Sequence, residues 1–146
     1  MEATYCGVGR IQQLLDNGAD PNEVDPQSMT ALHYACAVIY GQGPNCRRIW
    51  PEFQDIPGSV DALLASGANA DAQDEYGNTP LRYALCGAGA SLEEGSSAVQ
   101  YLCSQRQDIR IRIVRSLIAA GANLEASDVV GETALKAAVS HGAADC

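Results

Sequence analysis

The fold of this chain is decided by residues 66–85, which read SGANADAQDEYGNTPLRYAL. In this stretch Gly67 is suited to end a helix, Gly77 to form a turn, and Thr79 followed by Pro80 to begin the next helix. Two related stretches occur, NGADPNEVDPQSMTALHYAC at residues 17–36 and AGANLEASDVVGETALKAAV at residues 120–139. A segment that recurs three times in 146 residues is a structural unit, so the repeat predicts the fold.

Each copy predicts that one helix ends, that a loop reverses the chain, and that another helix begins after the loop. Apolar residues at helical spacing, such as Ile11 and Leu14, precede a glycine that ends the helix, here Gly18. After the loop, a threonine hydroxyl can accept a hydrogen bond from the first turn of the next helix; these threonines are Thr30, Thr79 and Thr133. In the first copy Ser28 replaces the turn glycine, so a positive φ there would strain the loop.

This pattern resembles the ankyrin repeat, whose signature is T-P-L-H-x-A. The chain has TALHYA at residues 30–35, TPLRYA at 79–84 and TALKAA at 133–138. The resemblance implies an all-α ankyrin-repeat solenoid, in which each unit is a loop, a first helix and a second helix. We therefore expect a single ankyrin-repeat domain over residues 1–146, with repeat loops near 17–36, 66–85 and 120–139.

The spacing of the copies predicts two insertions. The signature leucines are 49 and 54 residues apart, whereas the repeat is about 33 residues long. The extra residues fall between the first and second helix of a unit, near 40–57 and 87–108; the first insertion contains the only tryptophan, Trp50. Residues 97–103 read as an extra helix or as a forward extension of the next one. In that next helix Ile113 and Leu117 should point inward, with Arg112 and Arg115 outward.

Composition limits the class of partner. The net charge of −9 argues against nucleic acid and favours a basic protein partner, although many acidic proteins are acidic for solubility alone. The chain lacks an apolar run of about 20 residues, so no membrane partner is expected. The six cysteines lack CxxC spacing, which favours reduced thiols in the cytoplasm; Cys36 and Cys86 are expected to behave as small apolar residues.

The polar residues indicate structure rather than catalysis, so we expect no enzyme activity and no cofactor. The histidines are His33 and His141. The resemblance implies that His33 hydrogen-bonds the backbone of a neighbouring loop, and His141 is expected in the last helical turn. Acids recur just ahead of each turn, where a carboxylate can accept from nearby backbone N–H groups; they are Asp25, Asp74 and Asp128.

The resemblance implies that partners contact the loop tips and the exposed face of the first helices. We therefore expect partner contacts from Gln27, Met29, Glu75, Tyr76, Asn78, Val130 and Glu132, with Pro26 and Val129 beside them. Large, adaptable side chains such as Tyr76 and Met29 suit an interface, but they could equally shield the loop stems. Trp50, beside Arg47 and Arg48, is a further candidate for binding; alternatively it covers the repeat core.

These features predict a non-catalytic protein-interaction scaffold, monomeric on its own. It would act as an inhibitor or immunity-type protein against a basic partner. One alternative is a regulatory ankyrin segment of a larger enzyme or receptor. A third hypothesis is a small-molecule or metal sensor that uses Cys36, Cys46 and Cys86.

Overall fold

The structure, a computed structural model, describes residues 8–37, 56–86 and 97–140, and their regular structure is helical apart from one isolated bridge between Ser127 and Thr133. The helices are α1 (Val8–Asp16), α2 (Ala31–Ala37), α3 (Ile56–Ala65), α4 (Pro80–Cys86), α5 (Ser97–Ala119) and α6 (Ala134–Ser140). The predicted all-α ankyrin-type solenoid is confirmed for this part of the chain.

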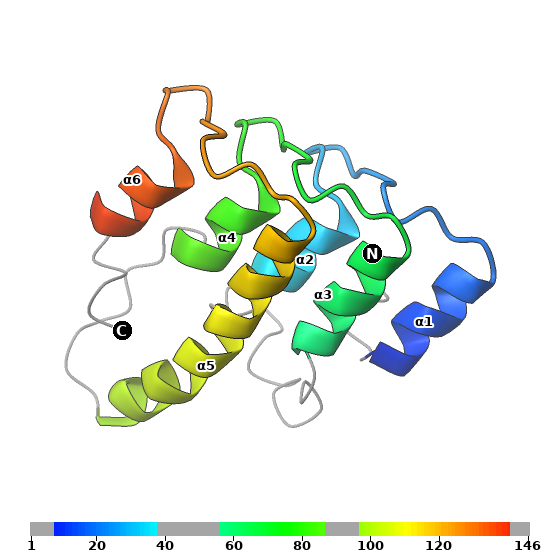
Figure 1. Ribbon diagram of the computed structural model, residues 1–146, viewed down its shortest axis with the longest axis horizontal. Helices are drawn as coiled ribbons and strands as arrows, with labels where there is room; N and C mark the ends of the chain where they lie inside the picture. Colours follow the sequence, from blue (N-terminus) through cyan, green and yellow to red (C-terminus); the bar gives the residue numbers. More distant parts are fainter. Residues whose placement is uncertain (1–7, 38–55, 87–96, 141–146) are drawn as a thin grey trace.

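The helices form two layers (Figure 1). α1, α3 and α5 lie side by side in one layer, and α2, α4 and α6 lie side by side in the other. α2 packs on α3 and α4 packs on α5 across the layers, so each of these pairs is the first and second helix of one unit. The three loops, residues 17–30, 66–79 and 120–133, all leave the helices at the same edge of the molecule (Figure 1).

The helix boundaries define where the predicted insertions lie. α3 begins at Ile56, so residues 56 and 57, at the end of the first expected insertion, are helical and buried. α5 is continuous over 23 residues, so residues 97–108 form a forward extension of the second helix rather than a separate one. Trp50 and the remaining insertion residues lie outside the described residues, as does His141.

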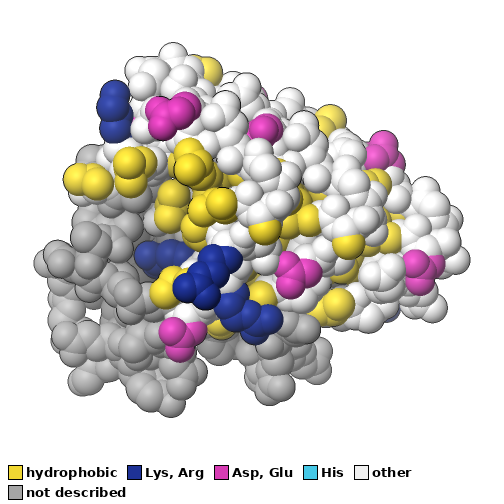
Figure 2. All heavy atoms as spheres, in the orientation of Figure 1, with side chains coloured by type: hydrophobic (Ala, Val, Ile, Leu, Met, Phe, Trp, Pro, Cys, Tyr) yellow, Lys and Arg dark blue, Asp and Glu magenta, His cyan; other side chains and the backbone are white. Residues whose placement is uncertain are grey.

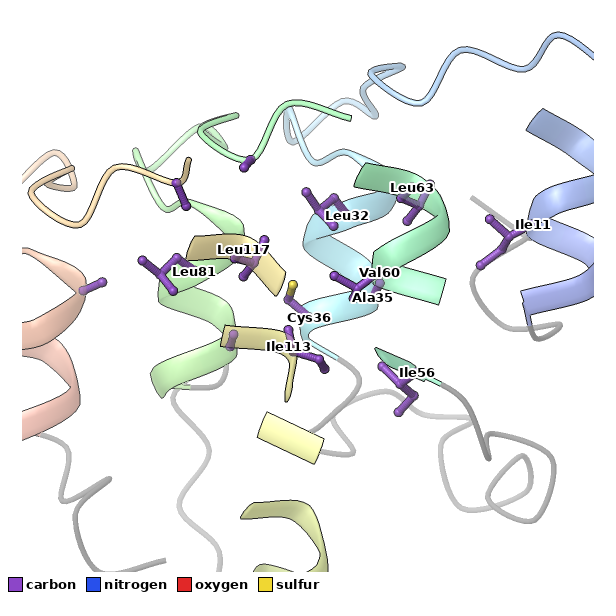
Figure 3. Packing of buried hydrophobic residues seen from close by; sticks show 14 residues of the cluster. Ile11, Leu32, Ala35, Cys36, Ile56, Val60, Leu63, Leu81, Ile113 and Leu117 are labelled. Atoms are coloured by element: carbon purple, nitrogen blue, oxygen red, sulfur yellow. The ribbon is translucent and has the colours of Figure 1, made fainter. Parts of the chain in front are cut away.

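The core is a row of apolar side chains between the two layers (Figure 3). Leu32 and Leu81 from the first helices meet Val60, Ile113 and Leu117 from the second helices, and all of these are buried. The thiol of Cys36 lies among them (Figure 3), and burial raises its pKa. Cys36 is therefore the small apolar core residue that its sequence position predicts.

On α5 the expected faces are also confirmed. Ile113 and Leu117 are fully buried, whereas Arg112 and Arg115 are exposed. Figure 2 shows basic side chains gathered over α5, while acidic side chains recur along the edge where the loops lie. Acidic side chains are thus present along the loops, and a cluster of basic side chains lies on α5.

The turn position of each loop has a left-handed backbone, as the glycines predict. φ is 79° at Gly77 and at Gly131, and 60° at Ser28, which is the equivalent position of the first loop. Ser28 is thus a strained non-glycine residue, and the expectation for this loop is confirmed. Gly77 also lies against the next loop, because a Cβ there would be 3.0 Å from Cα of Asp128.

Candidate protein-binding surface

The three loops together form a continuous surface, called here the loop edge (residues 17–30, 66–79 and 120–133). Each loop is held by one aspartate that accepts two backbone N–H groups across its turn. Asp74 Oδ1 accepts from N of Tyr76 at 2.9 Å and from N of Asn78 at 2.8 Å. Asp25 and Asp128 make the equivalent pairs of bonds at 2.8 to 2.9 Å. The expectation that these recurrent acids are structural is confirmed.

Tyrosines support two of these aspartates from the first helices. The hydroxyl of Tyr34 donates to Asp25 Oδ2 at 2.6 Å, and that of Tyr83 donates to Asp74 Oδ2 at 2.7 Å. Partial burial raises the pKa of Asp74, but the hydrogen bonds from Asn78, Tyr83 and Tyr76 outweigh it and hold this pKa below its ordinary value. The carboxylate is therefore ionised at neutral pH.

Hydrogen bonds also join each loop to the next. N of Glu75 donates to O of Gln27 at 3.1 Å, and N of Val129 donates to O of Tyr76 at 3.0 Å. A side-chain carbonyl makes a second link, since N of Asn69 donates to Asn22 Oδ1 at 2.7 Å. The loop tips are therefore fixed relative to one another, and a partner would meet a preorganised surface rather than separate flexible loops.

His33 lies at the seam between the first two units. Its Nε2–H donates to O of Asn78 at 3.1 Å, and its Nδ1 accepts from N of Thr30 at 3.1 Å. Burial lowers the pKa of His33, although the bond to Asn78 and the charge of Asp74 raise it in part. The imidazole is thus neutral and structural, as the family resemblance implies, and it is fully buried.

Arg82 takes the place of this histidine at the next seam. Its guanidinium lies 3.1 Å from Asp128 Oδ2 and 2.8 Å from Glu132 Oε2, and it also donates to O of Glu132 at 3.1 Å. Sequence reasoning missed this clamp. The signal was present, because residues 79–84 read TPLRYA with arginine at the signature histidine position.

The loop edge is acidic throughout. It contains nine of the 18 acidic residues of the chain and neither lysine nor arginine; the acids are Asp20, Glu23, Asp25, Asp71, Asp74, Glu75, Glu125, Asp128 and Glu132. Arg82 of α4 neutralises part of the third loop. The rest of the charge lies beside exposed apolar side chains, of which Tyr76, Val129 and Val130 lie at the tips.

The predicted contact residues divide into two groups. Gln27, Glu75, Tyr76 and Val130 are exposed at the tips. Met29, Asn78 and Glu132 are half-buried, and each takes part in the hydrogen bonds within its loop, as when Asn78 Nδ2 donates to Asp74 Oδ2 at 3.0 Å. The second group supports the tips from below, and Trp50 lies outside the described residues.

Two other kinds of site were sought in the described part of the chain. None of its helices is long and apolar enough to cross a membrane. In the same residues no three His, Cys, Asp or Glu side chains are grouped so that they could hold a metal ion.

Comparisons with known proteins identify the repeat. Residues 1–112 match the family model described as ankyrin repeats in three copies. The chain is 30% identical over 121 residues to the NF-kappa-B inhibitor delta of Mus musculus, which covers 82% of this chain and 32% of that protein.

In two further relatives the matched segment is a small part of a much larger protein. Glycerophosphocholine phosphodiesterase gde1 of Schizosaccharomyces pombe is 33% identical over 94% of this chain, which spans 9% of that enzyme. Neurogenic locus notch homolog protein 1 of Danio rerio is 36% identical over 54% of this chain, which spans 3% of that protein. The chain thus spans at most 32% of the length of these relatives.

Proposed function

This chain belongs to the ankyrin-repeat family, and on that premise we propose that it is a non-catalytic module that binds a basic protein through the loop edge. The observation that carries the proposal is the composition of this surface: nine acidic residues, no basic residue, and exposed apolar side chains at its tips. An acidic surface of this kind favours a basic partner and disfavours nucleic acid.

Binding would use both charge and apolar contact. The acids of the loop edge attract a basic partner from a distance and raise the association rate, an effect that salt screens. Tyr76 is exposed in the middle loop, between Gln27 and Val129, and its large side chain would serve as the central anchor of the contact. Because hydrogen bonds already fix the tips, little conformational entropy would be lost on binding.

The biological role we propose is inhibition of the bound partner, of the immunity or inhibitor type, by one copy of the chain in the cytoplasm. Its relative from Mus musculus is an inhibitor by name, which supports this role. A rigid acidic surface can act as an inhibitor by covering a basic functional surface on its partner, with no chemistry of its own.

A second candidate is a regulatory segment of a larger enzyme or receptor. The similarity to gde1 and to the notch homologue favours it, since this chain spans a small part of each. Sequencing the full-length transcript from the source organism separates the two candidates. A reading frame that runs beyond residues 1–146 into a catalytic or receptor domain would support the second.

The binding surface is tested by affinity capture from the source organism, with quantitative mass spectrometry of the retained proteins. Glu75→Gln removes one charge from an exposed loop tip, and Asp61→Asn removes one charge from the exposed side of α3. We expect Glu75→Gln and Tyr76→Ala to reduce retention of a basic protein, and Asp61→Asn to leave it unchanged. Equal losses for Glu75→Gln and Asp61→Asn would show that net charge, not the loop edge, governs binding.

A further inference from the structure

Different side chains hold the first seam, between loops 17–30 and 66–79, and the second seam, between loops 66–79 and 120–133. At the first, the imidazole of His33 donates from Nε2 to O of Asn78. At the second, Arg82 occupies the same position of the repeat, and its guanidinium pairs with Asp128 and Glu132. Arginine keeps its charge at every ordinary pH, whereas histidine can gain a proton near neutral pH. The two seams should therefore respond differently to acid.

The partners of His33 fix its protonation state. N of Thr30 is a donor only, so Nδ1 accepts from it, at 3.1 Å; O of Asn78 is an acceptor only, so the proton lies on Nε2. His33 and Thr30 are 0% and 2% exposed, so solvent scarcely reaches either. A second proton, on Nδ1, would face the N–H of Thr30 and leave this buried donor without its acceptor.

The groups that face this imidazole come from both loops and from α4. Asp25 of the first loop and Asp74 of the second act on it through their charge, and the ring of Tyr83 lies edge to face with it at 5.7 Å between centroids. Arg82 of α4 is directed to the third loop instead, and α3 carries one titratable residue, the exposed Asp61. The two nearby carboxylates thus favour a charged ring.

Burial outweighs these carboxylates. It lowers the pKa of His33 below its ordinary 6.5, and the hydrogen bond to O of Asn78 and the charges of the two aspartates raise this pKa only in part. As the pH falls below 6.5, a ring that has left the seam gains its proton first, so acid favours the open seam. The second seam responds only at lower pH, because N of Glu132 donates to Asp128 and holds the pKa of this carboxyl below its ordinary 3.8.

We propose that His33 makes the first seam a pH-sensitive contact: in mild acid the first loop separates from the second, while the second and third loops stay joined. The opening is local, because Asp25 holds the turn of the first loop through N of Gln27 and N of Met29, without His33. The loop edge would then lose its fixed register, and a partner bound there would be released. That last consequence rests on the proposed binding function; the opening itself does not.

Two backbone amides report the two seams separately. N of Glu75 donates to O of Gln27 across the first seam, and N of Val129 donates to O of Tyr76 across the second. These amides occupy equivalent positions of the repeat. The test is hydrogen exchange of the full chain, resolved to single amides between pH 7.5 and 5 and corrected for the intrinsic exchange rate at each pH.

The expected result is a fall in protection at one of these amides. A group of pKa 6.5 that gains its proton only in the open state changes the opening equilibrium by up to about 30-fold at pH 5, so protection of the Glu75 amide should fall by up to that factor and protection of the Val129 amide by less than about threefold. An equal fall at both amides, or no fall at Glu75, would overturn the proposal. This comparison needs no variant, so it decides the question even where a variant fails to fold.

Two variants assign the effect to the imidazole. His33→Gln keeps a donor and an acceptor in a side chain that does not titrate, so it should abolish the fall at Glu75. Arg82→His combined with Glu132→Asn copies the first seam into the second, so the fall should then appear at Val129 as well. A folded His33→Gln protein that keeps the fall, or a folded double variant without one at Val129, would contradict the assignment to this position.

These measurements use the chain alone and no partner. The proposal can therefore fail while Glu75→Gln still weakens capture of a basic protein, and the proposed binding can fail while the first seam still opens in acid.

Discussion

The turn position of the loops offers a direct test of how closely the loops pack. Gly77 and Gly131 are equivalent, and both have φ of 79°. A Cβ at Gly77 would lie 3.0 Å from Cα of Asp128 and 3.1 Å from N of Val129, whereas a Cβ at Gly131 would meet nothing within 4 Å. Replacing each with alanine therefore imposes the same backbone strain at both positions and a steric clash at only one.

The expected magnitudes follow from these two effects. Alanine in the left-handed region costs about 1–2 kcal/mol, and the lower entropy of the unfolded chain returns about 0.4–1 kcal/mol. Gly131→Ala should thus lower the free energy of unfolding by about 0–1.6 kcal/mol. For Gly77→Ala the contact is with backbone, which cannot rotate away, so a further ~1–3 kcal/mol is expected for overpacking.

The assay is urea unfolding followed by circular dichroism at 222 nm, with the slope compared between variants to confirm that the transition is the same. Ser28→Gly is a useful third variant, because it relieves strain at the equivalent position and should not destabilise the protein. Equal losses for Gly77→Ala and Gly131→Ala would refute the reasoning, since they would mean that the middle and last loops do not pack as closely as the structure shows.

Three further predictions concern buried polar groups. His33 has a lowered folded pKa, so the unfolded chain binds more protons below pH 6.5 and stability should fall as the pH drops from 7.5 to 5; His33→Gln should flatten this dependence in urea unfolding. Tyr83→Phe removes the bond to Asp74 and should cost about 1–2 kcal/mol in the same assay, with the exposed Tyr76→Phe as a control that stays within about 0.5 kcal/mol. The thiol of Cys36 should resist iodoacetamide in the folded protein and react in urea, as measured by peptide mass spectrometry, because it is buried and its pKa is raised.

Much of the scaffold could be predicted from the sequence because the same physical requirement recurs at the same position of each copy. The turn that needs a positive φ has glycine twice, so Ser28 could be recognised as the strained exception. The aspartate before each turn and the threonine after it were also predictable, since their partners lie within four residues in the chain.

The candidate surface was less predictable because it depends on how one unit stacks on the next. Asn78 and Glu132 lie in the loops beside exposed residues, but His33 and Arg82 of the preceding unit engage them and leave them half-buried. Such contacts span 45 and 50 residues, and no local pattern reports them. The burial of Leu32 and the exposure of Leu135 differ for the same reason, although both occupy one position of the signature.

The same comparison separates the residues that hold the loops from those that we propose contact a partner. Residues that recur, such as Asp25, Asp74 and Asp128, accept backbone N–H groups and hold the loops. Their carboxylates are therefore already engaged in hydrogen bonds within the loop. Positions that vary, such as Gln27, Tyr76 and Val130, are equivalent in the repeat, exposed, and without a side-chain requirement for the turn. Because the recurring residues fix the backbone, these varying positions can change without loss of the fold, and that freedom is what a surface needs to specify one partner.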